Sequence, residues 1–230
     1  MKAEAPTGFV LAGGHSTRLG QDKVLLPWQG STLLEDALSK LRIVCDQVYI
    51  CTNRQELGKY APAIPDGVGS ANADNAIGPI GPLGGIVAAL EATATEWNCF
   101  LPVDLPLLPV RLLEEMLDRA RCESGYAVIP LWAGRQQPLC AIYHRDLLPG
   151  LRVSMMEGKY KVMLALEEAA KAAGSLRKQE GVFEVQKFIE MYAVPSEMGA
   201  DWFLNINTPE ALRQARHKVA QNPLSLRTGK

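Results

Sequence analysis

The sequence predicts an α/β fold in which a mostly parallel, twisted sheet lies between two layers of helices. Short apolar runs alternate with segments of helical periodicity from residue 8 to about residue 143. Such alternation is typical of parallel strands joined by helical crossovers. In addition, Asn98–Val103 is almost wholly apolar, as expected of a strand whose two faces are both buried in a parallel sheet.

The first half of the chain follows this alternation. Apolar residues of Thr32–Val44 recur three and four positions apart, and Ser31 or Thr32 is a suitable N-cap with Glu35 near a capping-box position. In chain order, we predict the strand Gly8–Ala12, the helix Thr32–Val44, the strand Asp46–Cys51, a short helix Gln55–Tyr60, a loop Pro65–Gly81, the helix Leu83–Ala94 and the strand Asn98–Val103.

The second half continues the pattern to about Pro149, after which it changes. We predict the helix Val110–Arg121, the strands Tyr126–Pro130 and Leu139–Tyr143, the helix Lys159–Ala173, the strands Phe183–Phe188 and Trp202–Ile206, and the helix Thr208–Val219. No repeat or linker divides the chain, so we expect a single domain over residues 1–230 with a flexible tail at 221–230.

The composition favours an ordinary globular protein. Of its 230 residues, 47% are hydrophobic and 21% are charged, and the net charge is −1. Because no block of like charge occurs, we expect neither nucleic acid nor a membrane as a partner. Residues 1–7 contain no apolar core of a signal peptide and no run approaches a membrane span, so we expect a cytoplasmic location. The five cysteines lack metal-site spacing, which favours buried reduced thiols over zinc or disulfides.

A glycine-rich loop follows the first predicted strand. It has the sequence Leu-Ala-Gly-Gly-His-Ser-Thr-Arg-Leu-Gly-Gln-Asp-Lys over residues 11–23. Glycines let backbone N–H groups approach an anion, and Arg18 and Lys23 add a planar fork and a point charge. This combination suits a triphosphate. The loop matches neither the P-loop nor the G-x-G-x-x-G fingerprint, which argues against a Rossmann-type dehydrogenase.

Further polar residues follow predicted strands and so fall at the same sheet edge. Asp104 comes directly after Asn98–Val103, where a carboxylate could bind Mg²⁺ beside phosphates or could cap the loop before the next helix. Asn53 follows the strand Asp46–Cys51, and Asp66 follows a further strand, in the sequence Ile64-Pro65-Asp66. On the residues alone, both are ordinary turn positions. Asn207 or Thr208 is an N-cap for the last helix, with Pro209 in its first turn.

The loop pattern L-A-G-G-x-S-x-R-x-G-x-D-K resembles the signature of the MobA-like nucleotidyltransferases. The segments Pro102-Val103-Asp104-Leu105-Pro106, Gly81-Pro82-Leu83-Gly84-Gly85-Ile86 and Asn205-Ile206-Asn207-Thr208-Pro209 also resemble that family. The likeness runs in the expected order from the first strand to the last motif. It implies a Rossmann-like three-layer α/β/α sandwich, the nucleotidyltransferase fold. On the residues alone, Gly84 and Gly85 serve either close helix–strand packing or ligand contact.

The resemblance also implies a reaction, the transfer of GMP from GTP to the phosphate of molybdopterin cofactor with release of pyrophosphate. It implies Mg²⁺ on Asp104, catalytic roles for Arg18, Lys23 and Asp104, and an acceptor side completed by residues 150–220. The implied nucleotide-binding residues are Leu11, Ala12, Gly13, Gly14, Ser16, Lys23, Asn53, Asp66 and Asp104, and those on the acceptor side are Asn205 and Asn207.

Two alternatives remain beside guanylyl transfer. Relatives transfer CMP to molybdopterin cofactor or to other small phosphates, although the adjacent Gly13 and Gly14 fit the guanylyl branch better. A non-catalytic nucleotide-binding protein of the same fold would be marked by loss of Arg18, Lys23 or Asp104, and all three are present. Beyond the two substrates, accessory cofactor-biosynthesis proteins and apo-molybdoenzymes are implied partners.

Overall fold

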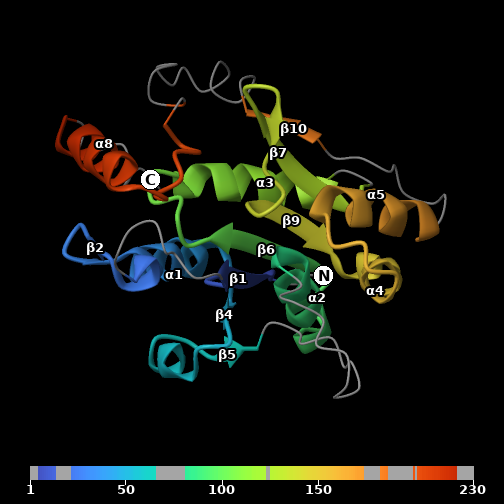
Figure 1. Cartoon of the computed structure of the whole chain (residues 1–230). Coiled ribbons are helices and arrows are strands. Elements are labelled where there is room, and N and C mark those ends of the chain that lie inside the picture. Colours follow the sequence, from blue (N-terminus) through green and yellow to red (C-terminus); the bar gives the residue numbers. More distant parts are fainter. Residues whose placement is uncertain are drawn as a thin grey trace.

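The computed structural model describes residues 5–13, 22–65, 81–122, 125–173, 182–185, 199 and 201–221. A mixed sheet runs through the molecule in the strand order β10-β7-β9-β6-β1-β4-β5, with β8 paired to β7 (Figure 1). Its strands are β1 (Thr7–Leu11), β4 (Gln47–Cys51), β5 (Ala63–Ile64), β6 (Trp97–Pro102), β7 (Ala127–Trp132), β8 (Arg135–Gln136), β9 (Ala141–His144) and β10 (Val182–Glu184).

Most of this sheet is parallel, as predicted. The strands β5, β4, β1 and β6 pair in parallel, as do β7 and β10. Only β9 and the short β8 pair in antiparallel fashion among the described strands of this sheet. Because β9 is antiparallel to both β6 and β7, those two strands point the same way, so their carboxyl ends share one edge.

Helices cover both faces of the sheet, which gives the predicted three layers (Figure 1). The α-helices are α1 (Leu33–Val44), α2 (Pro82–Ala92), α3 (Val110–Cys122), α4 (Leu148–Met156), α5 (Val162–Ala172) and α8 (Pro209–Gln221); the 3₁₀ helices are η2 (Lys23–Leu25), η3 (Gln55–Lys59) and η4 (Arg145–Leu147). The N-cap of α1 is Thr32, which forms a complete capping box with Glu35.

Alternate side chains of the strands enter two separate hydrophobic cores, because successive residues of a strand point to opposite faces. Val10 and Leu101 belong to the core beneath α1, α3 and α8, together with Ile206. Phe9 and Phe100 stack with ring centroids 5.1 Å apart in the other core, beneath α2, α4 and α5. The C-terminal segment therefore packs into the same core as the first strand.

The predicted strand Trp202–Ile206 is wrong. Residues 201–203 form a turn and residues 204–207 have no regular structure. Leu204 N donates to Asp201 O, and Ile206 N donates to Asp104 O. The apolar side chains that suggested a strand, Trp202, Phe203 and Ile206, are buried in the core beneath α8 without joining the sheet. Burial alone, and not strand pairing, accounts for this apolar run.

Two further differences concern helices and a hairpin. The predicted helix Lys159–Ala173 begins later, as α5 at Val162, and is preceded by the unpredicted helix α4. The two-stranded hairpin β2 (Pro27–Trp28) and β3 (Ser31–Thr32) was also not predicted. Within the predicted strand Phe183–Phe188, β10 ends at Glu184, and residues 186–188 lie outside the described residues. Most of the predicted loop Pro65–Gly81 and of the predicted tail 221–230 also lies outside them.

All five cysteines are free thiols, and four are buried as predicted. Cys122, at the end of α3, is exposed instead. No helix among the described residues has the length and apolar character needed to span a membrane.

Candidate active site

Three parallel strands end side by side at the centre of the sheet. Leu11 of β1 lies opposite Cys51 of β4 and Pro102 of β6. Pairing continues past the strand ends, because Ala12 N donates to Cys51 O at 3.1 Å and Val103 N donates to Leu11 O at 3.2 Å. Residues just beyond these ends share the edge at which open parallel sheets bind ligands.

The structure brings part of the predicted site to this edge. Leu11, Ala12, Gly13, Asn53 and Asp104 lie at or just beyond the three strand ends. Asn53 is exposed, as is Gly13 of the glycine-rich loop. The predicted residues Gly14, Ser16, Arg18 and Asp66 lie outside the described residues.

The loop returns to this edge at Lys23, the first residue of η2. The Lys23 ammonium donates to Asp104 Oδ2 at 2.8 Å and to Asn207 Oδ1 at 2.9 Å. The Lys23 and Asp104 side chains are only 17% and 13% exposed. Water therefore screens this ion pair less than it screens a pair at the open surface. Three segments far apart in the chain thus meet at one ammonium group.

Asp104 keeps one oxygen available. Its Oδ1 atom is buried and has no hydrogen-bond partner within the described part of the chain. A buried carboxylate oxygen without a donor is costly unless a ligand or ion satisfies it. The carboxylate therefore fits a divalent cation, and its contact with Lys23 does not support a role in capping the loop before α3. No cluster of three or more His, Cys, Asp or Glu ligands occurs among the described residues.

The segment before α8 reaches the site through its backbone as well as through Asn207. Ile206 N donates to Asp104 O at 3.0 Å, which ties this segment to the end of β6. The N-cap of α8 is Thr208, whose hydroxyl accepts from Ala211 N at 3.1 Å. Asn205 is exposed and donates to Phe203 O at 3.4 Å. Asn207 is thus placed against the Lys23–Asp104 pair, whereas Asn205 contacts its own segment.

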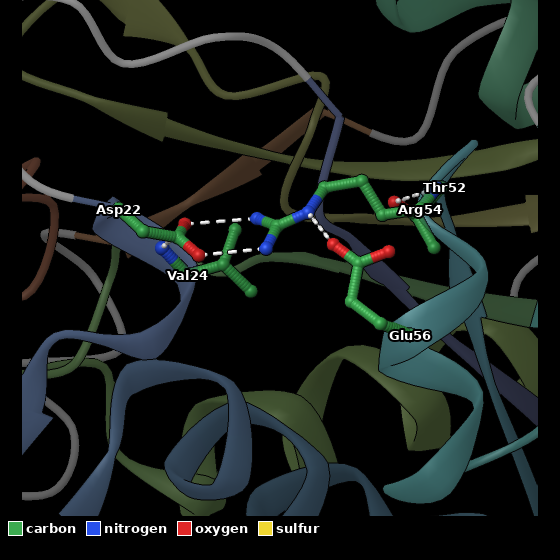
Figure 2. Close-up of polar contacts among 5 residues, drawn as sticks. All are labelled: Asp22, Val24, Thr52, Arg54 and Glu56. Atoms are coloured by element: carbon green, nitrogen blue, oxygen red, sulfur yellow. Dashed lines mark hydrogen bonds and ion pairs between the residues drawn. The ribbon is translucent and has the colours of Figure 1, made fainter.

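An ion-pair network lies beside Lys23 and was missed in the sequence (Figure 2). The Arg54 guanidinium donates to both Asp22 oxygens, at 2.8 and 2.7 Å, and its Nε donates to Glu56 at 2.7 Å. The hydrogen bonds from Arg54 hold the pKa of the Asp22 carboxyl below its usual value. The same pairing, first with Asp22 and then with Glu56, raises the pKa of Arg54. Arg54 thereby joins the end of β4 to the end of the glycine-rich loop.

A buried lysine supports the loop that carries Asp104 and was also missed. Lys40 of α1 donates to Pro106 O at 2.6 Å and pairs with Asp36 at 2.7 Å. Burial lowers the pKa of Lys40, and the neighbouring Asp36 opposes that shift. The position of Lys40 between the apolar residues Leu38 and Leu41 gave a signal for this role, because a lysine in an apolar stripe needs a polar partner.

Two adjacent glycines, Gly84 and Gly85, lie near the start of α2. Gly81 is the N-cap, with φ of 70°, and Pro82 follows at the first helical position. Gly84 and Gly85 are buried in this helix, which covers the sheet face opposite α1. Their burial agrees with close helix–strand packing, the first of the two interpretations of these glycines.

Comparison with known proteins adds independent findings. Residues 8–173 match the family model described as the MobA-like NTP transferase domain. A relative in Bacillus cereus, named probable molybdenum cofactor guanylyltransferase, is 33% identical over 218 residues, which cover 93% of this chain and 96% of the relative.

Solved structures agree with this match. Molybdopterin-guanine dinucleotide biosynthesis protein A from Archaeoglobus fulgidus is similar with a TM-score of 0.70 and 24% identity, covering 94% of this chain and 99% of that chain. The 2-C-methyl-D-erythritol 4-phosphate cytidylyltransferase from Thermus thermophilus is similar with a TM-score of 0.58 and 14% identity, covering 92% and 98%. Both show the nucleotidyltransferase fold. The family match spans most of the chain, and the chain therefore belongs to the MobA-like NTP transferase family and is a nucleotidyltransferase.

Proposed function

We propose that the protein transfers GMP from GTP to the phosphate of molybdopterin, forming molybdopterin guanine dinucleotide and releasing pyrophosphate. The observation that carries the proposal is the meeting of Lys23, Asp104 and Asn207 at the carboxyl edge of the sheet. The similarity, over 93% of this chain, to a relative named probable molybdenum cofactor guanylyltransferase supports the choice of donor and acceptor.

No covalent enzyme intermediate is needed, because the acceptor phosphate attacks the α-phosphorus directly. The chain then contributes positioning and charge stabilisation, which carry most of the catalysis in phosphoryl transfer. Lys23 neutralises charge that develops at the α-phosphate, and Arg18 binds the departing β and γ oxygens. The backbone of Leu11, Ala12, Gly13, Gly14 and Ser16 lines the phosphates, while Asn53 and Asp66 contact the nucleoside.

Mg²⁺ is the proposed cofactor, held by Asp104. The buried Oδ1 atom, which has no partner among the described residues, supports this assignment. Mg²⁺ favours one or two carboxylates together with phosphate oxygens and water, so a single aspartate is a sufficient protein ligand. When bound beside the triphosphate, the ion neutralises phosphate charge.

Residues 150–220 are proposed to complete the acceptor side, with Asn205 and Asn207 facing the acceptor phosphate. The contact of Asn207 with Lys23 supports a place for this segment beside the nucleotide. The single-domain organisation over residues 1–230, the accessory and apo-molybdoenzyme partners and the cytoplasmic location stay predictions.

Cytidylyl transfer is the second candidate, since a cytidylyltransferase shares the fold. Thermal unfolding with Mg²⁺ and each of GTP, CTP, ATP and UTP separates the two, because a ligand of the folded state raises the midpoint according to its affinity. We expect the largest increase with GTP, and a much smaller one in Asp104→Asn. A selective increase with CTP would move the protein to the cytidylyl branch, and no increase with any nucleotide would contradict both candidates.

A further inference from the structure

The carboxylate of Asp22 fixes the start of the short helix that carries Lys23. Asp22 is the N-cap of η2, and its Oδ1 atom accepts from Val24 N at 3.2 Å. Lys23 is the next residue, and its ammonium reaches Asp104 and Asn207. The direction in which Lys23 leaves the backbone therefore depends on how Asp22 is held.

Asp22 is held from the next strand by Arg54. Two parallel N–H···O bonds of 2.8 and 2.7 Å join the guanidinium to the two Asp22 oxygens (Figure 2). Such bidentate pairing fixes orientation as well as distance. Arg54 is itself fixed, because Glu56 accepts from its Nε and because Arg54 N donates to Thr52 Oγ1 at 3.2 Å.

We propose that Arg54 is a positioning residue for nucleotide binding, which acts through Asp22 to hold Lys23 in place for the phosphates. The inference rests on the proposed nucleotide site. Arg54 directly follows Asn53, the residue proposed to contact the nucleoside. One guanidinium therefore connects the nucleoside end of the site with its phosphate end.

The geometry favours positioning over direct contact between Arg54 and phosphate. The nitrogens Nε, Nη1 and Nη2 each donate to a carboxylate oxygen. Two carboxylates, Asp22 and Glu56, face this one cation, so the cluster as a whole is not positively charged. These bonds use three of the five guanidinium N–H groups, so a phosphate would find two N–H groups left and would lie beside two carboxylates, whereas the Lys23 ammonium lies at the strand ends themselves.

The test is a double-mutant cycle on binding of Mg²⁺–GTP and of Mg²⁺–pyrophosphate, measured by titration calorimetry without any acceptor. The variants are Arg54→Ala, Asp22→Asn and the two combined. Asparagine keeps an oxygen that can accept from Val24 N but loses the charge that binds Arg54. We expect each single change to weaken binding about tenfold, a typical size for coupling within one network, and the double change to add little.

The same two changes are made in a Lys23→Ala background. Because positioning acts through Lys23, Arg54→Ala should there cost little further GTP affinity, a result that a general loss of stability would not produce. Arg54→Lys should restore binding only in part, since an ammonium cannot form the bidentate pair. Arg152→Ala is the matched control. Arg152 of α4 also pairs with a carboxylate, that of Glu91 on α2, at 2.6 Å. It should leave binding unchanged.

Three results would overturn the proposal. If Asp22→Asn binds GTP normally while Arg54→Ala does not, Arg54 contacts the nucleotide directly. If the losses of Arg54→Ala and Lys23→Ala add in full, Arg54 does not act through Lys23. If Arg54→Ala and Arg54→Lys both bind like the parent protein, the network has no role in binding. Absence of GTP and pyrophosphate binding in the parent protein is a separate result, which would remove the proposed function itself and this inference with it.

Discussion

Lys23 and Asp104 lie 81 residues apart in the chain, yet the ammonium of one donates to the carboxylate of the other at 2.8 Å. Neither is placed by local structure alone. β1 and β6 pair in parallel, so the loop after β1 and the residue after β6 emerge at one edge. Asn207 then reaches the same ammonium from the far end of the chain. The geometry at this edge thus depends on the pairing of β1 with β6 and on the C-terminal segment that carries Asn207.

Removing the ammonium should abolish most activity while the fold stays intact. We expect Lys23→Ala to lower kcat for GMP transfer by about 10²-fold or more, the usual loss when one preorganised charge at a transition state is removed. Steady-state kinetics with circular dichroism as a fold check measure this. Lys59→Ala is the control, because it also removes a lysine ammonium. Lys59 is the last residue of η3, and its ammonium lies over the Tyr60 ring. Turnover in Lys23→Ala equal to that of the parent would refute the role of Lys23.

The two asparagines of the last motif should have different effects. Asn207 holds the Lys23 ammonium at 2.9 Å, whereas the contact of Asn205 is with Phe203 O. We therefore expect Asn207→Ala to weaken GTP binding about tenfold, because a hydrogen bond to a charged group contributes about 1.5 kcal/mol or more. Asn205→Ala should leave GTP binding unchanged and raise KM for the acceptor. Calorimetry with GTP and kinetics with varied acceptor separate the two effects, and equal GTP affinity in both variants would contradict this assignment.

A methyl group at Gly150 should destabilise the packing of α4 against α5. A Cβ at this position would lie 2.5 Å from Ala169 Cα, closer than packed atoms come. Gly150→Ala should lower the free energy of unfolding by about 1–3 kcal/mol, the usual cost of overpacking. Gly58→Ala is the control, because a Cβ there meets nothing within 4 Å. Urea unfolding measures the stability of both variants. A Gly150→Ala variant as stable as the parent would show that α4 and α5 move apart to accommodate the methyl group at no cost in free energy.

The free energy of unfolding should fall at alkaline pH, with a part that depends on Cys140. Burial raises the pKa of Cys140 to about 12 from 9.0, with Lys40 opposing this shift and Asp104 adding to it. Between these two values the folded protein keeps a proton that the unfolded chain releases, so stability falls as the pH rises through this window. The full effect of one such group is about 1.4 kcal/mol per pH unit.

Urea unfolding at pH 8, 9 and 10 measures this dependence. Cys140→Ala should show a shallower decline above pH 9 than the parent protein does. Cys122→Ala is the matched control, since Cys122 is exposed, and it should keep the decline of the parent. Identical pH dependence in all three proteins would show that Cys140 does not hold its proton as proposed.

The sequence predicted those parts of the fold in which a local pattern agrees with the tertiary structure. The α1 helix shows this, because its apolar spacing and its Thr32–Glu35 capping box both mark the same start. The α4 helix was missed because Pro149 and Gly150 resemble helix breakers. Pro149 instead lies in the first turn, where its missing N–H costs nothing, and Gly150 allows α5 to approach closely.

The β2–β3 hairpin was missed although a local signal was present. Gln29 and Gly30 both have positive φ, at 48° and 81°. That conformation suits a two-residue turn, and the glycine after Gln29 was its only mark in the sequence. The segment Trp202–Ile206 shows the opposite error, since its apolar residues are buried by the core beneath α8 and not by the sheet.

Among the site residues, those that follow strands, such as Asn53 and Asp104, could be placed from the sequence. Parallel strands end at the same edge of a sheet, so the residues after them reach that edge. It did not identify Arg54 or Lys40. Their roles depend on partners 32 and 66 residues away, Asp22 and Pro106. The apolar residues around Lys40 indicated that it needs a polar partner but not that Pro106 O is one, and no local pattern indicated the pair of Arg54 with Asp22. The resemblance to the family assigned one role to Asn205 and Asn207 together. The structure distinguishes them, because Asn207 contacts Lys23 whereas Asn205 contacts Phe203 O.

The most direct test of the proposed function is product analysis. The protein is incubated with Mg²⁺, purified molybdopterin cofactor and equal GTP and CTP, and the products are identified by mass spectrometry alongside pyrophosphate release. We expect molybdopterin guanine dinucleotide, one pyrophosphate per product, and no product with Asp104→Asn. A cytosine dinucleotide as the main product, or no dinucleotide while GTP remains bound, would contradict guanylyl transfer to molybdopterin.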